Sequence, residues 1–422
     1  MKKGALALTL FVALLALACG FGGTTAALWV TQPAAPGASA SVNFVVQDGD
    51  NAAKVADRLQ AARLIRNAQL FKLLAKFRHL DTGIETGTYE LTPGMTMDAI
   101  IAKLQTGKPD DVAITIPEAR RVLQMPFRLR VLPKFNSDNF VKIVTTGKFL
   151  DGTAVSSQYW YVMPLQKSAA FALEGYLYPD TYRFLKTDDE TVVIKRMLDE
   201  FGEQLCPGPA GGKPDAYIHD QAQCKAHAVT VGPNKVNLFT ALEQKYFVPS
   251  VAKNDTQALY DALILGSIAM REIPSLNDAK DIQGITDVYY NRYLHILGKR
   301  DNADLGLNLE ADPTVQYARD TEAKPGLDGI YWAPLGNVDV NAVAATNAYN
   351  TYTQTGLPPG PISAPGWDVL KAAVYPNPDG TSPYWFFLNE VCKGNATHYA
   401  EDAAKFETLK AQYLDPAKCP KS

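Results

Sequence analysis

The sequence predicts an α+β protein built from three parts: an apolar N-terminal segment, a small α+β module and a longer mixed α/β domain. The length of 422 residues exceeds the roughly 100–200 residues that one domain usually takes. Apolar residues make up 47% of the chain and charged residues 20%, as expected of chains that fold around hydrophobic cores. Helical and strand periodicities alternate after the apolar segment, which is the pattern of an α+β fold.

Residues 1–30 predict a membrane anchor or an export signal. Lys2 and Lys3 precede an uncharged, largely apolar run that ends near Val30, and about 20 such residues suffice to span a bilayer. Cleaved signals usually have a shorter apolar core, so we favour an uncleaved single-pass transmembrane anchor. A cleaved signal, or a lipoprotein cleaved before Cys19, remains an alternative. All three export the rest of the chain, because the lysines favour a cytoplasmic N-terminus.

A polar linker, residues 31–41, leads to the small module, residues 42–116. The expected order of elements is strand, helix, helix, strand, helix, strand. Apolar residues recur at helical spacing in three stretches, the first beginning at Ala52, the second at Leu70 and the third at Met97. Residues 87–91 and the alternating residues 112–116 have the composition of strands.

The remaining residues, 117–422, form the expected longer mixed α/β domain. Residues 203–254 are rich in proline and glycine and are interpreted as an extended loop or insertion. The segment Asp255–Glu272 is apolar nearly all round, which predicts a buried helix that stops before Pro274.

Composition excludes two classes of function. The chain has 41 Lys+Arg and 44 Asp+Glu residues, a formal net charge of −3, which provides no basic footprint for nucleic acid. The five histidines form no HExxH motif, and neither the close pair Cys206 and Cys224 nor the later pair Cys392 and Cys419 has zinc-ligand spacing, so we expect no metal and no cofactor. In an oxidising compartment, sequence order suggests those two pairs as disulfides, although four cysteines allow three pairings.

Glu272 is the residue that the pattern singles out for chemistry. It ends a buried helix, where burial and the helix dipole both disfavour a negative charge. Both effects raise the pKa of a carboxyl group towards the range that a general acid needs at neutral pH. A terminal glutamate that simply points into water is the competing interpretation.

Five motifs, in order, resemble the endolytic murein transglycosylases, the MltG or YceG-like family of bacterial envelopes. The sequence LEGYLYPDTY at residues 173–182 resembles the family's EGxxxPDTY, and SIAMRE at 267–272 resembles SIVEKE. The other three are VYYNR at 288–292, GLNLEADPTVQYA at 306–318 and YNTYTQTGLPPGPISAPG at 349–366. Residues 42–116 resemble the LysM-like domain that precedes the catalytic domain in this family.

The resemblance implies cleavage of the β-1,4 bond between MurNAc and GlcNAc in peptidoglycan, leaving 1,6-anhydroMurNAc ends and terminating nascent strands. The family's catalytic glutamate falls on Glu272. One carboxyl group suffices for this chemistry, because the sugar's own C6 hydroxyl is the nucleophile. Ordinary glycosidases need two carboxyl groups to activate water or to form a glycosyl-enzyme.

The resemblance also implies residues that line the glycan groove: Glu174, Asn291, Asp312, Thr314, Asn350 and Tyr352. The stretches 312–314 and 350–352 equally resemble turns that are stabilised by side-chain to backbone hydrogen bonds. Sugar stacking is an expectation for the motif tyrosines Tyr176, Tyr178, Tyr182 and Tyr352. Arg292 is expected to hold a carboxylate such as Glu174 or Asp312. Two departures from the family pattern are Met270, where a glutamate is usual, and Ala119, where a glycine is usual.

Three functions therefore compete. The first is an active lytic transglycosylase at the cell membrane, with its catalytic domain outside the cytoplasm, glycan strands as substrate and peptidoglycan synthases as partners. Met270 motivates the second, a peptidoglycan-binding scaffold with impaired catalysis. A conventional hydrolase that uses Glu174 and Asp312 as an acid pair is the third.

Overall fold

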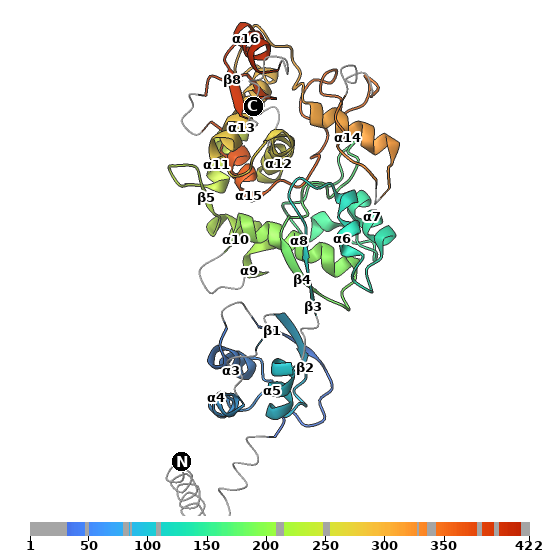
Figure 1. Cartoon of the computed structure of the whole chain (residues 1–422), viewed down its shortest axis with the longest axis vertical. Helices are drawn as coiled ribbons and strands as arrows, with labels where there is room; N and C mark the ends of the chain where they lie inside the picture. Colours follow the sequence, from blue (N-terminus) through green and yellow to red (C-terminus); the bar gives the residue numbers. More distant parts are fainter. Residues whose placement is uncertain are drawn as a thin grey trace, which may run out of the picture. The chain divides into compact units, whose positions relative to one another are not determined.

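The computed structural model divides the chain into two compact units: residues 1–113 with 183–186, and residues 114–182 with 187–422. It describes residues 32–46, 50–78, 84, 87–106, 111–207, 215–247, 254–326, 329–335, 343–377, 382–391 and 396–414. The expected N-terminal anchor, residues 1–30, lies outside these ranges. Within them, no helix combines the length and apolar character needed to cross a membrane. In the described ranges, four two-stranded sheets and many helices confirm the α+β class (Figure 1).

The first unit has the predicted order of elements. They are β1 (Val42–Val46), α3 (Ala52–Ala61), α4 (Ala68–Phe77), β2 (Gly87–Leu91), α5 (Met97–Thr106) and β3 (Asp111–Thr115). Strands β1 and β2 are antiparallel, with Val42 opposite Leu91 and Val46 opposite Gly87. Asn51 and Asn67 cap the first two helices, each accepting a hydrogen bond from a backbone N–H three residues ahead. Their apolar faces form one core, which includes Leu59, Phe71 and Tyr89.

The second unit is mostly helical. Its longer helices are α7 (Ser137–Thr146), α8 (Glu190–Leu205), α11 (Leu238–Tyr246), α12 (Asp255–Glu272), α13 (Ala279–Ile296), α14 (Asp312–Ala323), α15 (Trp367–Val374) and α16 (Ala403–Tyr413). Shorter helices and strands are η2 (Val122–Gln124), α6 (Pro126–Leu129), η3 (Val155–Ser157), α9 (Asp215–Ile218), α10 (Gln221–Ala226), β5 (Thr230–Val231), β6 (Val236–Asn237), β7 (Phe386–Asn389) and β8 (Thr397–Ala400). Strand β4 (Thr181–Leu185) pairs with β3, and the chain passes between the units within these two strands.

Helix α12 is the centre of the second unit and has the predicted bounds. It packs against α11, α13 and α15, which lie beside it in Figure 1. Asn254 caps its start by accepting a hydrogen bond from the backbone N–H of Gln257. Ile273 turns extended, the conformation that a residue before proline prefers, and the helix therefore ends at Glu272.

The stretch expected to be an extended loop contains helices where it is described. Residues 215–247 form α9, α10, the β5–β6 hairpin and α11, and Leu238, Leu242 and Tyr246 are buried. The proline and glycine content misled the interpretation, since the apolar face of α11 packs on α12 and overrides weak local propensity.

A disulfide joins Cys206 to Cys224, which confirms the first of the two pairs that sequence order suggests. Both cysteines are fully buried, and the bond ties the end of α8 to α10. The suggested partners Cys392 and Cys419 lie outside the described residues.

Replacing Cys206 and Cys224 together by serine should lower the free energy of unfolding by about 3 kcal/mol, since the bond closes a loop of 18 residues. Urea unfolding of the oxidised protein and of the double variant measures the difference. Equal midpoints for the two proteins would contradict this stabilisation, and non-reducing peptide mapping serves as the control that the bond is present.

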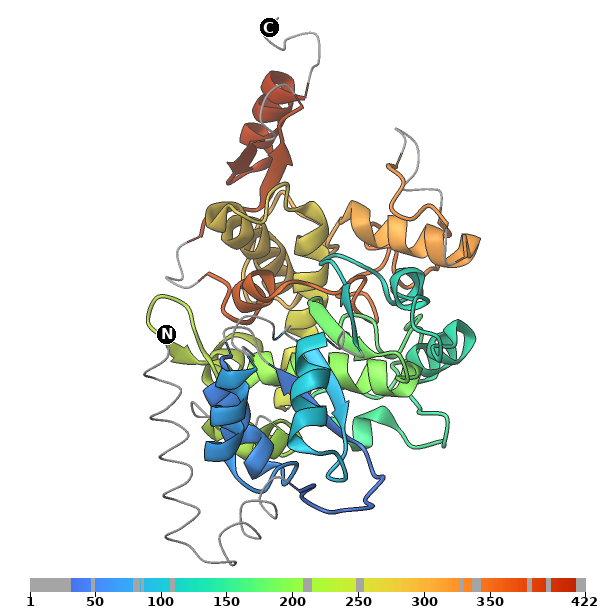
Figure 2. The same ribbon diagram turned by 60° about the horizontal axis from the view of Figure 1, so that its bottom comes forward.

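The C-terminal hairpin and α16 form a small lobe at one edge of the second unit (Figure 2). Strands β7 and β8 are antiparallel, and the ring of Phe406 stacks on that of Phe386 with the centroids 5.0 Å apart. This lobe matters because one of its faces lines the cavity described below.

Three of the motif tyrosines are core residues. Tyr176, Tyr178 and Tyr182 are each less than a tenth exposed. Tyr182 donates its hydroxyl proton to the carbonyl oxygen of Tyr178, and the hydroxyl oxygen of Tyr176 accepts a hydrogen bond from the backbone N–H of Met163. Sugar stacking at these three positions was a wrong expectation, because other segments cover their rings.

Candidate active site

A cavity of about 300 Å³ opens at the end of α12. Five separate parts of the second unit meet there: the end of α12, one face of α13, the segment around residue 310, the segment around residue 352, and the C-terminal lobe. The lining residues are Glu272, Tyr289, Arg292, Glu310, Asp312, Tyr352, Phe386, Phe387, Leu388, Asn389 and Phe406.

The environment of the cavity raises the pKa of the Glu272 carboxyl group. Desolvation by the surrounding protein raises its pKa to about 7, and the negative charge of Asp312 acts in the same direction. A hydrogen bond from the hydroxyl of Tyr289, 3.0 Å from Glu272 Oε1, opposes the rise in pKa, as do the charges of Arg271 and Arg292. Near neutral pH this group can therefore both give and accept a proton. The predicted raised pKa is confirmed, with desolvation as the main cause.

Helix α13 supplies the two groups that hold this end of the site. Tyr289 and Arg292 are three residues apart and therefore share one helix face. Arg292 donates to the carbonyl oxygens of Leu309 at 2.7 Å and Trp385 at 2.9 Å, and it lies 3.7 Å from the carboxylate of Glu310. Arg292 therefore lies beside a carboxylate, as expected, but this carboxylate belongs to Glu310 and not to Glu174 or Asp312.

Asp312 and Tyr352 meet across the cavity, although 40 residues separate them in sequence. The hydroxyl of Tyr352 donates to Asp312 at 2.7 Å. Their segments are held together behind the site, because Thr351 accepts hydrogen bonds from the backbone N–H groups of Glu310 and Ala311. The structure thus brings together three of the residues singled out from the sequence: Glu272, Asp312 and Tyr352.

Glu174 lies elsewhere, in a buried ionic cluster. It is 1% exposed, and its carboxyl oxygens accept hydrogen bonds from the backbone N–H of Val122 at 2.9 Å and the hydroxyl of Tyr317 at 3.1 Å. Desolvation raises its pKa to about 7 in spite of the nearby charge of Arg121. Glu174 does not line the cavity, so it forms no acid pair with Asp312 there.

Asn291, Thr314 and Asn350 are also buried, and none of them lines the cavity. Asn291 donates to the carbonyl oxygens of Ser382 and Tyr384 and accepts a hydrogen bond from Arg300. Thr314 bonds the carbonyl oxygen of Ala311, and Asn350 accepts from the backbone N–H of Tyr352. Thr314 and Asn350 therefore fix the segments that carry Asp312 and Tyr352, whereas Asn291 holds the segment that leads into β7.

Sequence reasoning missed several lining residues. Tyr289 stands inside the VYYNR motif, three residues before Arg292, and helical spacing from that arginine could have identified it. Asn389 donates to the backbone carbonyl of Glu272 at 3.1 Å, yet the two residues are 117 positions apart in the sequence. No local pattern indicated Asn389 or Phe406, because these residues belong to the C-terminal hairpin and to α16, which are distant in sequence from the family motifs.

Met270 is 5% exposed and does not line the cavity. The departure from the family pattern at this position therefore leaves the lining of the site unchanged. Among the residues that the structure describes, no group of three or more His, Cys, Asp or Glu side chains is arranged to hold a metal ion.

A sequence model of the YceG-like family matches residues 44–412. The endolytic murein transglycosylase of Bacillus subtilis is 24% identical over 368 residues, covering 85% of this chain and 81% of that protein. The endolytic murein transglycosylase of Streptococcus pneumoniae D39 is 23% identical over 387 residues, covering 89% of this chain. The alignment spans only 58% of that pneumococcal protein.

Among solved structures, a YceG-like protein of Listeria monocytogenes is similar, with 23% sequence identity and a TM-score of 0.49. The match covers 88% of this chain and 99% of that one.

Proposed function

The chain belongs to the YceG-like family, and from this premise we propose that it is a lytic transglycosylase that cleaves peptidoglycan glycan strands internally. One observation carries the proposal: Glu272, the residue that matches the family's catalytic glutamate, lies in a cavity with its pKa raised to about 7. Relatives named endolytic murein transglycosylase support the substrate class.

The proposed reaction uses Glu272 twice. Its protonated form gives a proton to the oxygen of the β-1,4 bond between MurNAc and GlcNAc, and the bond to the anomeric carbon breaks. The C6 hydroxyl of the same MurNAc attacks that carbon, and the Glu272 carboxylate takes the hydroxyl proton. The product is a 1,6-anhydroMurNAc end. Because the nucleophile belongs to the substrate, its effective concentration is high, and no second catalytic carboxyl group is required.

The other lining groups suit this reaction. The negative charge of Asp312 can stabilise the positive charge that develops at the anomeric carbon. The hydroxyl of Tyr289 orients the Glu272 carboxyl group. The partly exposed rings of Phe387 and Phe406 lie beside the polar groups, an arrangement common in sugar sites.

The chemical form of the product tests the proposal. The full-length chain is incubated with uncrosslinked glycan strands, and the new MurNAc ends are identified by mass spectrometry. We expect 1,6-anhydro ends from the wild type and from Glu310→Gln, which removes an exposed carboxyl group from the same cavity. Reducing ends would identify a hydrolase instead, and no cleavage by the wild type would overturn the enzymatic function in favour of a binding scaffold.

The pH dependence of kcat/KM should show a falling limb with a midpoint near pH 7, because the reaction begins from protonated Glu272. Asp312→Asn removes a charge that raises the Glu272 pKa, so its limb should move to lower pH. Tyr289→Phe removes a hydrogen bond that lowers this pKa, so its limb should move to higher pH. Shifts of about half a unit to one unit in opposite directions are expected. Movement of both limbs in the same direction would contradict Glu272 as the titrating acid.

We also propose that the chain acts outside the cytoplasm, attached to the membrane through residues 1–30, with residues 42–116 as a LysM-like module. The buried Cys206–Cys224 disulfide supports an oxidising compartment. In this position the enzyme would cut nascent strands and terminate their elongation beside peptidoglycan synthases. Protease accessibility in intact spheroplasts tests the orientation: cleavage within residues 114–422 is expected, and full protection would contradict it.

A further inference from the structure

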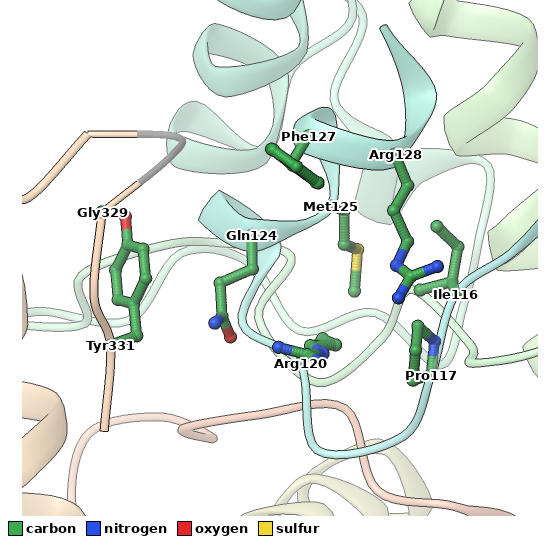
Figure 3. A pocket seen from close by; sticks show the side chains of 9 residues that line it. All are labelled: Ile116, Pro117, Arg120, Gln124, Met125, Phe127, Arg128, Gly329 and Tyr331. Atoms are coloured by element: carbon green, nitrogen blue, oxygen red, sulfur yellow. The ribbon is translucent and has the colours of Figure 1, made fainter. Parts of the chain in front are cut away.

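A second pocket, of about 240 Å³, lies on the second unit between the loop after β3 and the segment after α14. Figure 3 shows Tyr331 and Gly329 on one side, Arg128, Ile116 and Pro117 on the other, and Arg120, Gln124 and Met125 between them. Phe127, half exposed, completes the lining. We call this the arginine pocket.

Its two arginines give the pocket a positive charge. Arg120 and Arg128 are both exposed, and the side chain of neither makes a hydrogen bond or ion pair to any residue that the structure describes. The lining contains no aspartate or glutamate. Guanidinium groups presented in this way suit a planar anion that accepts two hydrogen bonds, above all a carboxylate.

The loop that presents Arg120 is held rigidly. Ala119 has a φ of 61°, a left-handed conformation that favours glycine and costs an alanine energy. Backbone hydrogen bonds on both sides retain it, from Ala119 to Ala364 and from Ala364 to Arg120, each 2.9 Å long. Next in sequence, Arg121 is fully buried against the ring of Tyr317. The backbone that carries the Arg120 side chain is therefore fixed before a ligand binds, and no entropy is lost in ordering this loop.

The arginine pocket lies close to the candidate active site. Tyr331 lines the pocket, and the ring of the next residue, Trp332, contacts the guanidinium of Arg271 at 4.2 Å. Arg271 directly precedes Glu272, and the charge of Arg120 is near enough to lower the pKa of Arg271. A branched ligand whose main chain lies at Glu272 can therefore extend a side branch towards Arg120.

We propose that the arginine pocket binds a carboxylate of the peptide stem carried by the glycan strand that is cut at Glu272. This inference rests on the proposed function and deepens it by naming a subsite. Peptidoglycan stems are short peptides with small apolar side chains and free carboxyl groups. The mixture of Ile116, Pro117 and Met125 with two arginines matches that chemistry. A phosphate site usually offers backbone N–H groups at a helix start, whereas the short helix α6 here begins with Pro126, which has none.

Selectivity between two substrates tests the subsite. For the full-length chain, kcat/KM is measured on glycan strands with intact stems and on strands stripped of stems by an amidase. In Arg120→Gln and Arg128→Gln, the ratio of the two values should fall about fivefold to tenfold relative to the wild type, mainly through KM on the intact strands. Lys134→Gln, an equal change of charge at an exposed residue outside the lining, should keep the wild-type ratio.

A binding measurement tests the subsite independently of the proposed reaction, because binding requires no cleavage. Calorimetry with a soluble disaccharide tetrapeptide should show tighter binding of the free acid than of its amidated form, and the difference should vanish in Arg120→Gln. That result would support the subsite even if the wild type cut no strands. Equal affinity for the two forms, together with an unchanged substrate ratio in both arginine variants, would overturn it.

Discussion

Replacing Glu272 by glutamine should lower kcat/KM on glycan strands by at least about 10³-fold, because the variant has neither the proton donor nor the acceptor. Glutamine keeps the size of the side chain and can still accept a hydrogen bond from Tyr289, so the cavity should retain its shape. Quantifying anhydro ends from single-turnover reactions measures the loss. The control is Glu310→Gln, which should stay within about fivefold of the wild type.

The same substitution should stabilise the protein at alkaline pH. The pKa of Glu272 is about 7 in the folded chain and near 4.5 when unfolded. Between these values the native state binds a proton that the unfolded state lacks, so stability falls as pH rises through this window. Glu272→Gln removes that loss and should raise the free energy of unfolding at pH 8 by on the order of 2 kcal/mol, with little gain below pH 4.5.

Thermal unfolding at pH 5 and pH 8 checks this gain. A rise in Tm of about 4 °C at pH 8, larger than the rise at pH 5, is expected for a unit of this size. A lower Tm at both pH values would mean that the carboxylate is stabilised in the fold, which is incompatible with a general acid near neutral pH. Together the two results would describe a site that sacrifices stability for reactivity.

Replacing Arg121 by methionine should destabilise the second unit by about 3–5 kcal/mol. Arg121 is fully buried, stacks on the ring of Tyr317 at 4.0 Å, bonds Thr321 and lies 3.8 Å from the carboxylate of Asp320. Its charge is also what lowers the pKa of the buried Glu174 carboxyl group. Without Arg121, Glu174 and Asp320 lose their buried cation.

Urea unfolding at several pH values measures this loss of stability. The pKa of Glu174 is raised to about 7, so its contribution to stability is fully present below pH 4.5 and decreases as pH rises to 7. Removing the cation raises this pKa further, and the penalty in Arg121→Met should therefore grow with pH. A penalty that is constant across pH would assign it to lost packing around the arginine instead.

A second substitution separates charge from packing. Glu174→Gln in the Arg121→Met background should recover part of the lost stability, because it removes the unpaired carboxyl group. The coupling energy from the double-mutant cycle should be about 1–3 kcal/mol for two groups in direct electrostatic contact. Full additivity of the two substitutions would show that Arg121 and Glu174 act independently.

The bounds of helix α12 could be predicted from the sequence because nearby residues determine them. An apolar pattern all round it, Asn254 before it and Pro274 after it determine its bounds, and burial of this helix alone places Glu272 at the end of a desolvated segment. The order of elements in residues 42–115 is likewise local, since period and turn residues specify it. The suggestion of Cys206–Cys224 needed only their proximity along the chain.

The sequence did not predict which motif side chains point into the cavity. Glu174 and Asp312 both stand in polar motif positions, yet Arg121 and Tyr317 cover the first while the second lines the cavity. Asn389 and Phe406 reach the cavity from a hairpin and helix that no motif marks. The arginine pocket likewise combines a loop after β3 with a segment some 200 residues later in the chain.

The sequence by itself therefore determined the class of fold and the family, and it singled out Glu272 as the proposed acid. These depend on periodicity, on caps and on residue types at fixed spacing, all of which are properties of short stretches. Only the tertiary structure decided which carboxyl groups face the cavity and which are buried in ionic clusters. Exposure and pKa depend on the segments that pack over a side chain, and around Glu272 these range from Tyr289, 17 residues away, to Asn389, 117 residues away.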